Sequence, residues 1–270
     1  MKTKVKKESK TKEKKQGFLE LNYSMFINSF RKIKLWILAI IALDIAFYFI
    51  LMQAGTLFLG MLQQKASGIT LDSALLANPA GIEALSSTIR GFFIFLIASI
   101  IILIVFIAAL SGILKGIIWT ISAGKKPAFV FMKKFLLLSM IWIPSWLILV
   151  FLLAIGIKQD TAPLFILALV PFYLHFTNVL YILFLEESRI GMIKKAFSMG
   201  IRKILYYLIP YAAIALLFYA ISSVYNIISL KTGINPNVYL VIVVCFVAWV
   251  RYYLISIAMA VLKGHAHQKP

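Results

Sequence analysis

Acidic residues, histidines and cysteines are all scarce in this chain of 270 residues. Nine Asp and Glu residues stand against 28 Lys and Arg residues, which gives a formal net charge of +19 at pH 7. The single cysteine, Cys245, excludes an intramolecular disulfide and a thiolate metal cluster. No HExxH motif occurs, and "TISAGKKP" is not a phosphate-binding loop because Trp119 stands where the earlier glycine is required. The sequence therefore predicts no metal, no cofactor and no catalytic residue.

Apolar residues, by contrast, are abundant. Hydrophobic residues make up 62% of the chain and charged residues 14%, with a mean hydropathy of +0.96. Soluble domains average about 45–50% apolar and about 25% charged residues. Crossing a hydrocarbon core about 30 Å thick takes about 18–20 apolar residues. Six runs are long enough, and they predict an all-α integral membrane fold, a six-helix transmembrane bundle: 35–62, 91–119, 135–157, 163–185, 204–229 and 238–262.

The basic residues lie in alternate connections between these runs. They precede the first run, separate the second from the third and the fourth from the fifth, and follow the sixth. The positive-inside rule then predicts a cell-membrane protein with both termini in the cytoplasm. This placement favours anionic membrane lipids as partners over nucleic acid. The residues predicted at the lipid surface are Arg31, Lys32, Lys125, Lys126, Lys133, Lys134, Lys194, Lys195, Arg202 and Lys203.

The membrane domain has a tail at each end. Residues 1–17 are lysine-rich and contain no aromatic residue, which predicts a disordered cytoplasmic tail. This tail either only helps to set the orientation or also binds acidic lipids or a partner. We expect an interfacial helix over 18–34, the six-span domain over 35–263 and a cytoplasmic tail over 264–270.

Two segments beside the membrane have the spacing of amphipathic helices that lie on the cytoplasmic surface. The apolar face of the first comprises Leu19, Tyr23, Phe26, Phe30 and Ile33. The apolar face of the second comprises Ile190, Ile193, Phe197, Ile201 and Ile204. In each, a phenylalanine stands five residues before a basic pair, and a looser copy places Phe129 before Lys133 and Lys134.

These three segments predict a threefold hairpin repeat, in which an interfacial helix is followed by an outward and a returning span. The alternative is that each re-entering helix acquired basic and aromatic anchors without common descent.

The segments "SAGKKPAF" and "FLEESRIGMIKKAFSMGIRKI", each ahead of a span, carry a family resemblance. Over most of residues 18–263 the pattern resembles multi-pass archaeal and bacterial membrane families related to the membrane domain of glycerophosphodiester phosphodiesterases. The resemblance implies a helical membrane domain with no catalytic residues to transfer. The soluble phosphodiesterase domain of some relatives is absent from this sequence, so hydrolysis is not implied.

Two opposite charges interrupt the first and last runs. Asp44 stands ten residues after Lys34, and Arg251 stands twelve residues before Lys263. At 1.5 Å per residue these are depths of about 15 and 18 Å. Because an isolated charge at such a depth costs at least about 2.5 kcal/mol, we expect Asp44 and Arg251 to form a salt bridge that joins the two helices.

Further polar residues and prolines lie in the other runs. His175 and Asn178 are expected at a similar depth and could join Asp44 and Arg251 in one polar cluster. Such a cluster is either a proton or ion relay or a set of structural hydrogen bonds. Pro144, Pro171 and Pro210 predict helix kinks, as static bends or as hinges. Gly112 and Gly116 form a GxxxG motif, which indicates close helix packing.

Two classes of function fit these features best. The first is a non-catalytic membrane protein, a scaffold or lipid-interacting module of the cytoplasmic leaflet, with membrane-protein partners also considered. The second is a small transporter or channel whose path passes Asp44, His175 and Arg251. An enzyme ranks third, because no catalytic constellation is recognisable.

Overall fold

The computed structural model describes residues 18–31, 33, 35–69, 79–158 and 160–266. Over these ranges the regular structure is entirely helical, and six helices are long and apolar enough to span a membrane. The prediction of an all-α fold with six spanning helices is confirmed, and the protein is a multi-pass membrane protein. The helices are α1 (Phe18–Arg31), α2 (Trp36–Ser67), α4 (Pro79–Ser122), α5 (Phe129–Gly156), α6 (Ala162–Glu187), α7 (Met192–Arg202), α8 (Ile204–Thr232) and α9 (Pro236–Ala266).

Helices α2 and α4 are longer than a membrane crossing requires. They contain 32 and 44 residues, or about 48 and 66 Å of helix, against a hydrocarbon core of about 30 Å. The run expected to begin at residue 91 begins at Pro79, because residues 79–90 continue the same helix. Glu83 and Arg90 near its start favour extension into water over tilting within lipid.

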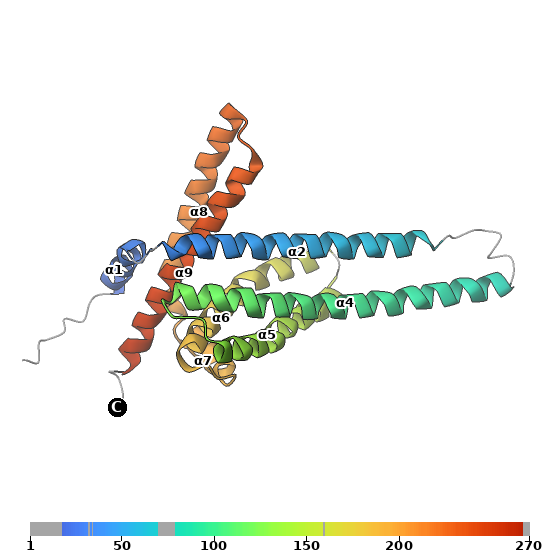
Figure 1. The fold of residues 1–270 in the computed structure, drawn as a ribbon, viewed down its shortest axis with the longest axis horizontal. Coiled ribbons are helices and arrows are strands. Elements are labelled where there is room, and N and C mark those ends of the chain that lie inside the picture. The colour runs from blue at the N-terminus through green and yellow to red at the C-terminus, as the bar shows by residue number, and fades with distance from the viewer. Residues whose placement is uncertain (1–17, 32, 34, 70–78, 159, 267–270) are drawn as a thin grey trace, which may run out of the picture.

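One end of the molecule gathers the basic segments. Figure 1 shows α1, α7, the connection between α4 and α5 (residues 123–128) and the C-terminal end of α9 together at this end. We call it the basic end. From here the α2–α4 hairpin and the α8–α9 hairpin diverge (Figure 1). Basic segments that are far apart in sequence thus lie on one side of the spanning helices, as their alternation predicts.

The buried core lies in the halves of the helices nearest the basic end. Seven consecutive residues of α6, from Val179 to Leu185, are buried, together with Phe135, Trp142 and Tyr253 from neighbouring helices. Farther out, α2, α4 and α8 expose large apolar side chains. Exposed apolar side chains carry no penalty in lipid. The core near the basic end is therefore what positions the buried polar groups.

The helix predicted ahead of the fifth span is present as α7, but its most buried stripe is rotated from the predicted one, of which only Ile193 and Phe197 contact the core. Its buried residues are Met192, Ala196, Met199 and Gly200, whereas Ile201, on the predicted stripe, is 64% exposed. The reason is steric, because a Cβ at Gly200 would lie 2.7 Å from Cε1 of Phe176. The absence of a side chain at Gly200 lets α7 approach α6 closely there, and Phe197 still meets the ring of Phe176 from the edge of the packed face.

The packing of α1 shows the same departure. Asn22 and Ser29 are buried, whereas Tyr23 and Phe30 of the predicted stripe are exposed. The indole Nε1 of Trp249 in α9 donates a hydrogen bond of 3.0 Å to Ser29 Oγ. Phe26 meets the rings of Trp249 and Tyr253 edge to face, and Phe30 stacks on Trp249 with ring centres 5.0 Å apart. Part of the predicted stripe therefore does contact the core. Helix α1 is therefore docked on α9 as well as placed beside the membrane.

The interfacial helix predicted ahead of the second hairpin, around Phe129, Lys133 and Lys134, is not formed as a separate helix. Helix α5 begins at Phe129, and Lys133 and Lys134 lie in its first turns. Residues 123–128 hold no helix beyond the turn that ends α4. Pro127 favours an extended conformation for the residue before it, which leaves too little chain for another helix. The interfacial element accompanies only the first and third hairpins.

Other predicted boundaries fit in part. The tail expected over residues 1–17 lies outside the described residues, as does Lys32. The C-terminal tail was predicted to begin at 264, but α9 continues to Ala266. Pro144, Pro171 and Pro210 all lie inside their helices, which continue past them. Bends at these prolines stay predictions.

The GxxxG motif marks a close contact between α4 and α5. A Cβ placed at Gly112 would lie 2.8 Å from Cα of Leu136, and one at Gly116 would lie 2.8 Å from Cε of Met132. A side-chain tip can move, but a backbone atom in a packed helix cannot. Gly112 is therefore the stricter of the two positions.

We expect Gly112→Ala to lower the free energy of unfolding by about 1–3 kcal/mol, the usual cost of overpacking. Gly91→Ala in the same helix is the matched control, because a Cβ there meets nothing within 4 Å. Both changes remove one glycine from α4, so their difference in detergent unfolding titrations measures the contact with Leu136. Equal stability of the two variants would contradict the close approach.

Candidate functional site

The most unusual feature of the interior is a buried carboxylate that contacts two cations. Asp44, in α2, is 0% exposed. Its Oδ1 accepts a hydrogen bond of 2.9 Å from Nη2 of Arg251, and Nη1 of Arg251 lies 2.7 Å from Oδ2. The ion pair predicted between the first and last spans is therefore present, and it joins α2 to α9.

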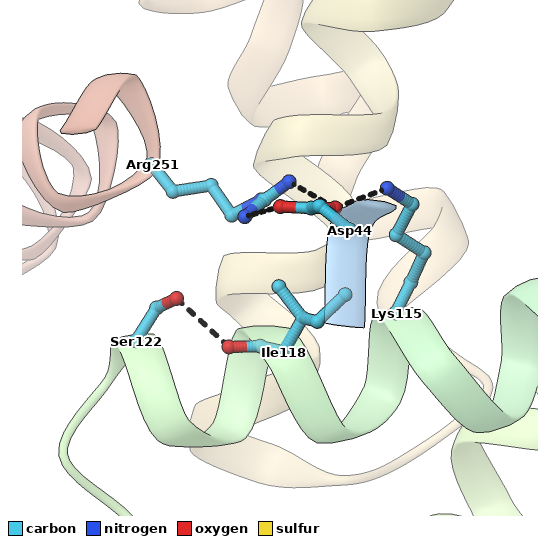
Figure 2. Close-up of polar contacts among 5 residues, drawn as sticks. All are labelled: Asp44, Lys115, Ile118, Ser122 and Arg251. Carbon is cyan, nitrogen blue, oxygen red and sulfur yellow. Dashed lines mark hydrogen bonds and ion pairs between the residues drawn. The ribbon is translucent and has the colours of Figure 1, made fainter. Parts of the chain in front are cut away.

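A third charged residue, Lys115, was not predicted. Its Nζ lies 2.8 Å from Oδ1 of Asp44. Figure 2 shows Lys115 of α4 and Arg251 of α9 reaching the carboxylate from opposite sides. A signal existed in the sequence, because Lys115 stands ten residues before Lys125, a depth of about 15 Å that matches Asp44. We call Asp44, Lys115 and Arg251 the charge cluster.

The charge cluster holds one negative and two positive groups. Lys115 lies close to two aromatic rings, with Nζ 4.2 Å from the ring centre of Phe47 and 4.8 Å from that of Tyr48. Cation–π contacts of this kind can supply about 2 kcal/mol or more where water is excluded. The rings therefore partly compensate the second cation, whereas Asp44 is the only carboxylate that either cation contacts among the described residues.

An apolar layer separates the charge cluster from the basic end. Ile40, Ile118, Ala248 and Tyr252 form a small buried core of their own. Ile40 lies one turn before Asp44, and Ile118 lies three residues after Lys115, so both stand on the side of the basic end. The side chains of Arg251 and Lys115 are 7% and 15% exposed and both face the fully buried Asp44. This arrangement locks helices together.

His175 and Asn178 belong to a second polar cluster, with different partners. The ring Nε2 of His175 lies 3.1 Å from the carbonyl oxygen of Gly200 in α7, and Nδ1 lies 3.0 Å from the hydroxyl of Tyr211 in α8. Asn178 also hydrogen-bonds to Tyr211. The expectation that His175 and Asn178 share a cluster with Asp44 is wrong at the level of direct contacts. The number of residues from the end of a helix predicts how deep a side chain lies. Its partners depend also on which side of α6 it occupies.

The contacts of His175 also specify its tautomer. A carbonyl oxygen only accepts hydrogen bonds, so Nε2 carries a proton and donates it to Gly200. In the neutral ring Nδ1 then accepts a hydrogen bond from the Tyr211 hydroxyl. Both ring nitrogens are used in joining α6 to α7 and α8, which is a structural arrangement.

Most of the residues predicted at the lipid surface are exposed, and their contact with lipid stays a prediction. Arg31, Lys125, Lys126, Lys133, Lys134, Lys194, Lys195 and Arg202 are exposed, and Lys203 is partly buried. Lys125 donates to the carbonyl oxygen of Leu185 at 2.6 Å and to Oε1 of Glu186 at 3.1 Å, and Lys195 pairs with Glu187. No three His, Cys, Asp or Glu side chains gather as a metal site in the described part of the chain.

Comparison of the chain with protein-family models, with curated proteins and with solved structures finds no match. The resemblance to membrane families related to glycerophosphodiester phosphodiesterases therefore stays a prediction.

Neutralising Asp44 and neutralising Lys115 should change the free energy of unfolding by different amounts. Asp44→Asn leaves two buried cations without a carboxylate and should lower the free energy of unfolding by about 3–5 kcal/mol. Lys115→Met keeps the ion pair of Asp44 with Arg251, removes the second cation and nearly conserves volume, so it should cost under about 1.5 kcal/mol. Unfolding titrations in one detergent would compare the two. A Lys115→Met loss as large as that of Asp44→Asn would show Lys115 to be the principal partner.

Proposed function

We propose that the protein is a non-catalytic scaffold or lipid-interacting module of the cytoplasmic leaflet, bound to anionic head groups and open to membrane-protein partners. The observation that carries this proposal is the surface of α7, where basic and apolar side chains are exposed together. Ile201 and Phe197 are exposed beside Lys194, Lys195 and Arg202. A helix with this surface lies in the plane of the interface, with its apolar side in the acyl boundary.

The packing of α7 supports a fixed surface. The stripe of Met192, Ala196, Met199 and Gly200 is buried against the core, and Gly200 O is hydrogen-bonded to His175. The exposed side chains are thus held at one height and one rotation relative to the spanning helices. Lipids at this surface would meet a preformed site, without the entropy loss of ordering a free helix.

The charge balance at the basic end points to a partner outside the chain. Glu186 and Glu187 each pair with one lysine, Lys125 and Lys195. Lys126, Lys134, Lys194 and Arg202 have no carboxylate partner among the described residues. Basic side chains near an anionic leaflet contribute about 1 kcal/mol each. Anionic head groups would supply the missing counter-charges.

The transporter hypothesis has less support. Asp44 and Arg251 are paired with each other behind an apolar layer, and His175 bonds to other helices. A path past all three residues would have to break the contacts that hold α2, α4 and α9 together. A solute flux through the reconstituted protein that falls in Asp44→Asn, with folding intact, would favour transport over the proposed role.

The lipid preference can be measured by fluorescence quenching with brominated lipids in reconstituted vesicles. We expect brominated phosphatidylglycerol to quench tryptophan more effectively than brominated phosphatidylcholine. In Lys194→Gln with Arg202→Gln this preference should weaken by about 2 kcal/mol, about 1 kcal/mol for each charge removed. The control is Lys65→Gln with Lys231→Gln, which removes two charges away from the basic end. Equal losses in both double variants would contradict a site on α7.

The orientation can be tested separately, in a Cys245→Ala background that leaves no native thiol. We expect a membrane-impermeant maleimide added to intact cells to label Lys231→Cys and to spare Lys194→Cys until the membrane is opened. The physical reason is that Lys194 belongs to the basic end, which the positive-inside rule retains in the cytoplasm. Labelling of Lys194→Cys in intact cells would reverse the assigned sides.

A further inference from the structure

A cavity of about 730 Å³ opens at the basic end, between the start of α2, the end of α4 and the last turns of α9. Its volume falls within the range of about 300–1,000 Å³ that is typical of small-molecule sites. The residues that line it are Trp36, Ile121, Ser122, Ala123, Gly124, Lys125, Lys126, Pro127, Tyr252, Ile255, Ser256 and Met259. None of them belongs to the charge cluster or to α7.

The turn that ends α4 brings two lysines to the cavity. Gly124 has a φ of 71°, a left-handed conformation that other residues rarely adopt, and its N–H donates to Ile121 O at 2.9 Å. The N–H of Lys125 donates to Thr120 O at 3.0 Å, which closes the turn. The Lys125 ammonium donates hydrogen bonds to Leu185 O and to Oε1 of Glu186. Lys126 is thus the cation at the cavity that has no described carboxylate partner.

The remaining walls are mostly apolar. Trp36, Ile255 and Met259 come from α2 and α9, and Ser122 and Ser256 donate their hydroxyl protons to carbonyl oxygens of their own helices. Ile121, a further wall residue, packs against the apolar layer around Ile40 and Ile118. The cavity therefore combines a cationic side with apolar walls, at the level where the interfacial helices lie.

We propose that this cavity binds one anionic phospholipid, with the phosphate at Lys126 and the upper acyl chains against Trp36, Ile255 and Met259. This inference rests on the proposed function and adds a defined site to it. A free phosphate would leave the apolar walls without a partner. The lysine-rich segment 1–17 carries the same charge sign as Lys126 and is disfavoured as an occupant.

Native mass spectrometry of the full chain, released from discs of phosphatidylglycerol and phosphatidylcholine, tests the site by the lipid retained. We expect one retained phosphatidylglycerol. Lys126→Gln should reduce its retention over phosphatidylcholine about fivefold, the effect of one basic contact, and Lys126→Arg should restore it. Ala123→Trp should also reduce retention, because the indole takes up part of the cavity while all charges are kept.

Lys134→Gln is the matched control, because Lys134 is exposed near the same connection but does not line the cavity. Equal retention in Lys126→Gln and Lys134→Gln would overturn the site. Release of the lipid by inorganic phosphate alone would overturn the role of the apolar walls. If Lys126→Gln changes retention while the α7 double variant leaves the quenching preference intact, the cavity stands and the α7 surface fails. The reverse pattern leaves the proposed function without this site.

Discussion

The structure depends on the need to neutralise Asp44, a carboxylate with no exposed surface. A buried charge without a partner is strongly destabilising, and here the partners come from helices separated by 71 and 207 residues from it along the chain. The ion pairs therefore specify which helices meet and at what height. The apolar residues around Ile40 and Ile118 form a small buried core beside this contact.

The other buried polar groups fix the positions of the surface helices. Ser29 and Trp249 tie α1 to α9, and His175 ties α6 to both α7 and α8. Each interfacial helix is thus joined to a spanning helix by a hydrogen bond inside the core. The interior polar groups named here all contact other helices of the chain, whereas the exposed basic groups lie at the basic end.

Several features could be predicted because the number of residues from the end of a spanning helix gives the depth of a side chain in the membrane. The six spans, the basic end and the pairing of Asp44 with Arg251 all follow from the positions of apolar runs and charges. Lys115 could be predicted in the same way, because its distance from Lys125 along the chain matches the distance of Asp44 from Lys34. It is the one charged residue in the run 91–119.

Direction around a helix axis could not be predicted in the same way. His175 was expected beside Asp44 from its depth alone, yet it hydrogen-bonds to Tyr211 and Gly200 because of how α6 is rotated in the core. Helices α1 and α7 present a related problem, since an apolar side chain there can face either lipid or protein. The small residues Ala196 and Gly200 decided which face of α7 packs, and hydrophobicity alone does not reveal that choice.

The second cation of the charge cluster has an electrical consequence. With Lys115 protonated, Asp44, Lys115 and Arg251 together carry one net positive charge inside the spanning region. Moving one elementary charge through the full membrane costs or releases about 2.3 kcal/mol per 100 mV, so a charge near half depth experiences roughly half of that. In the orientation proposed above, an inside-negative voltage pulls this charge toward the basic end. The fold therefore experiences a force in an energised cell membrane that is absent in a detergent micelle.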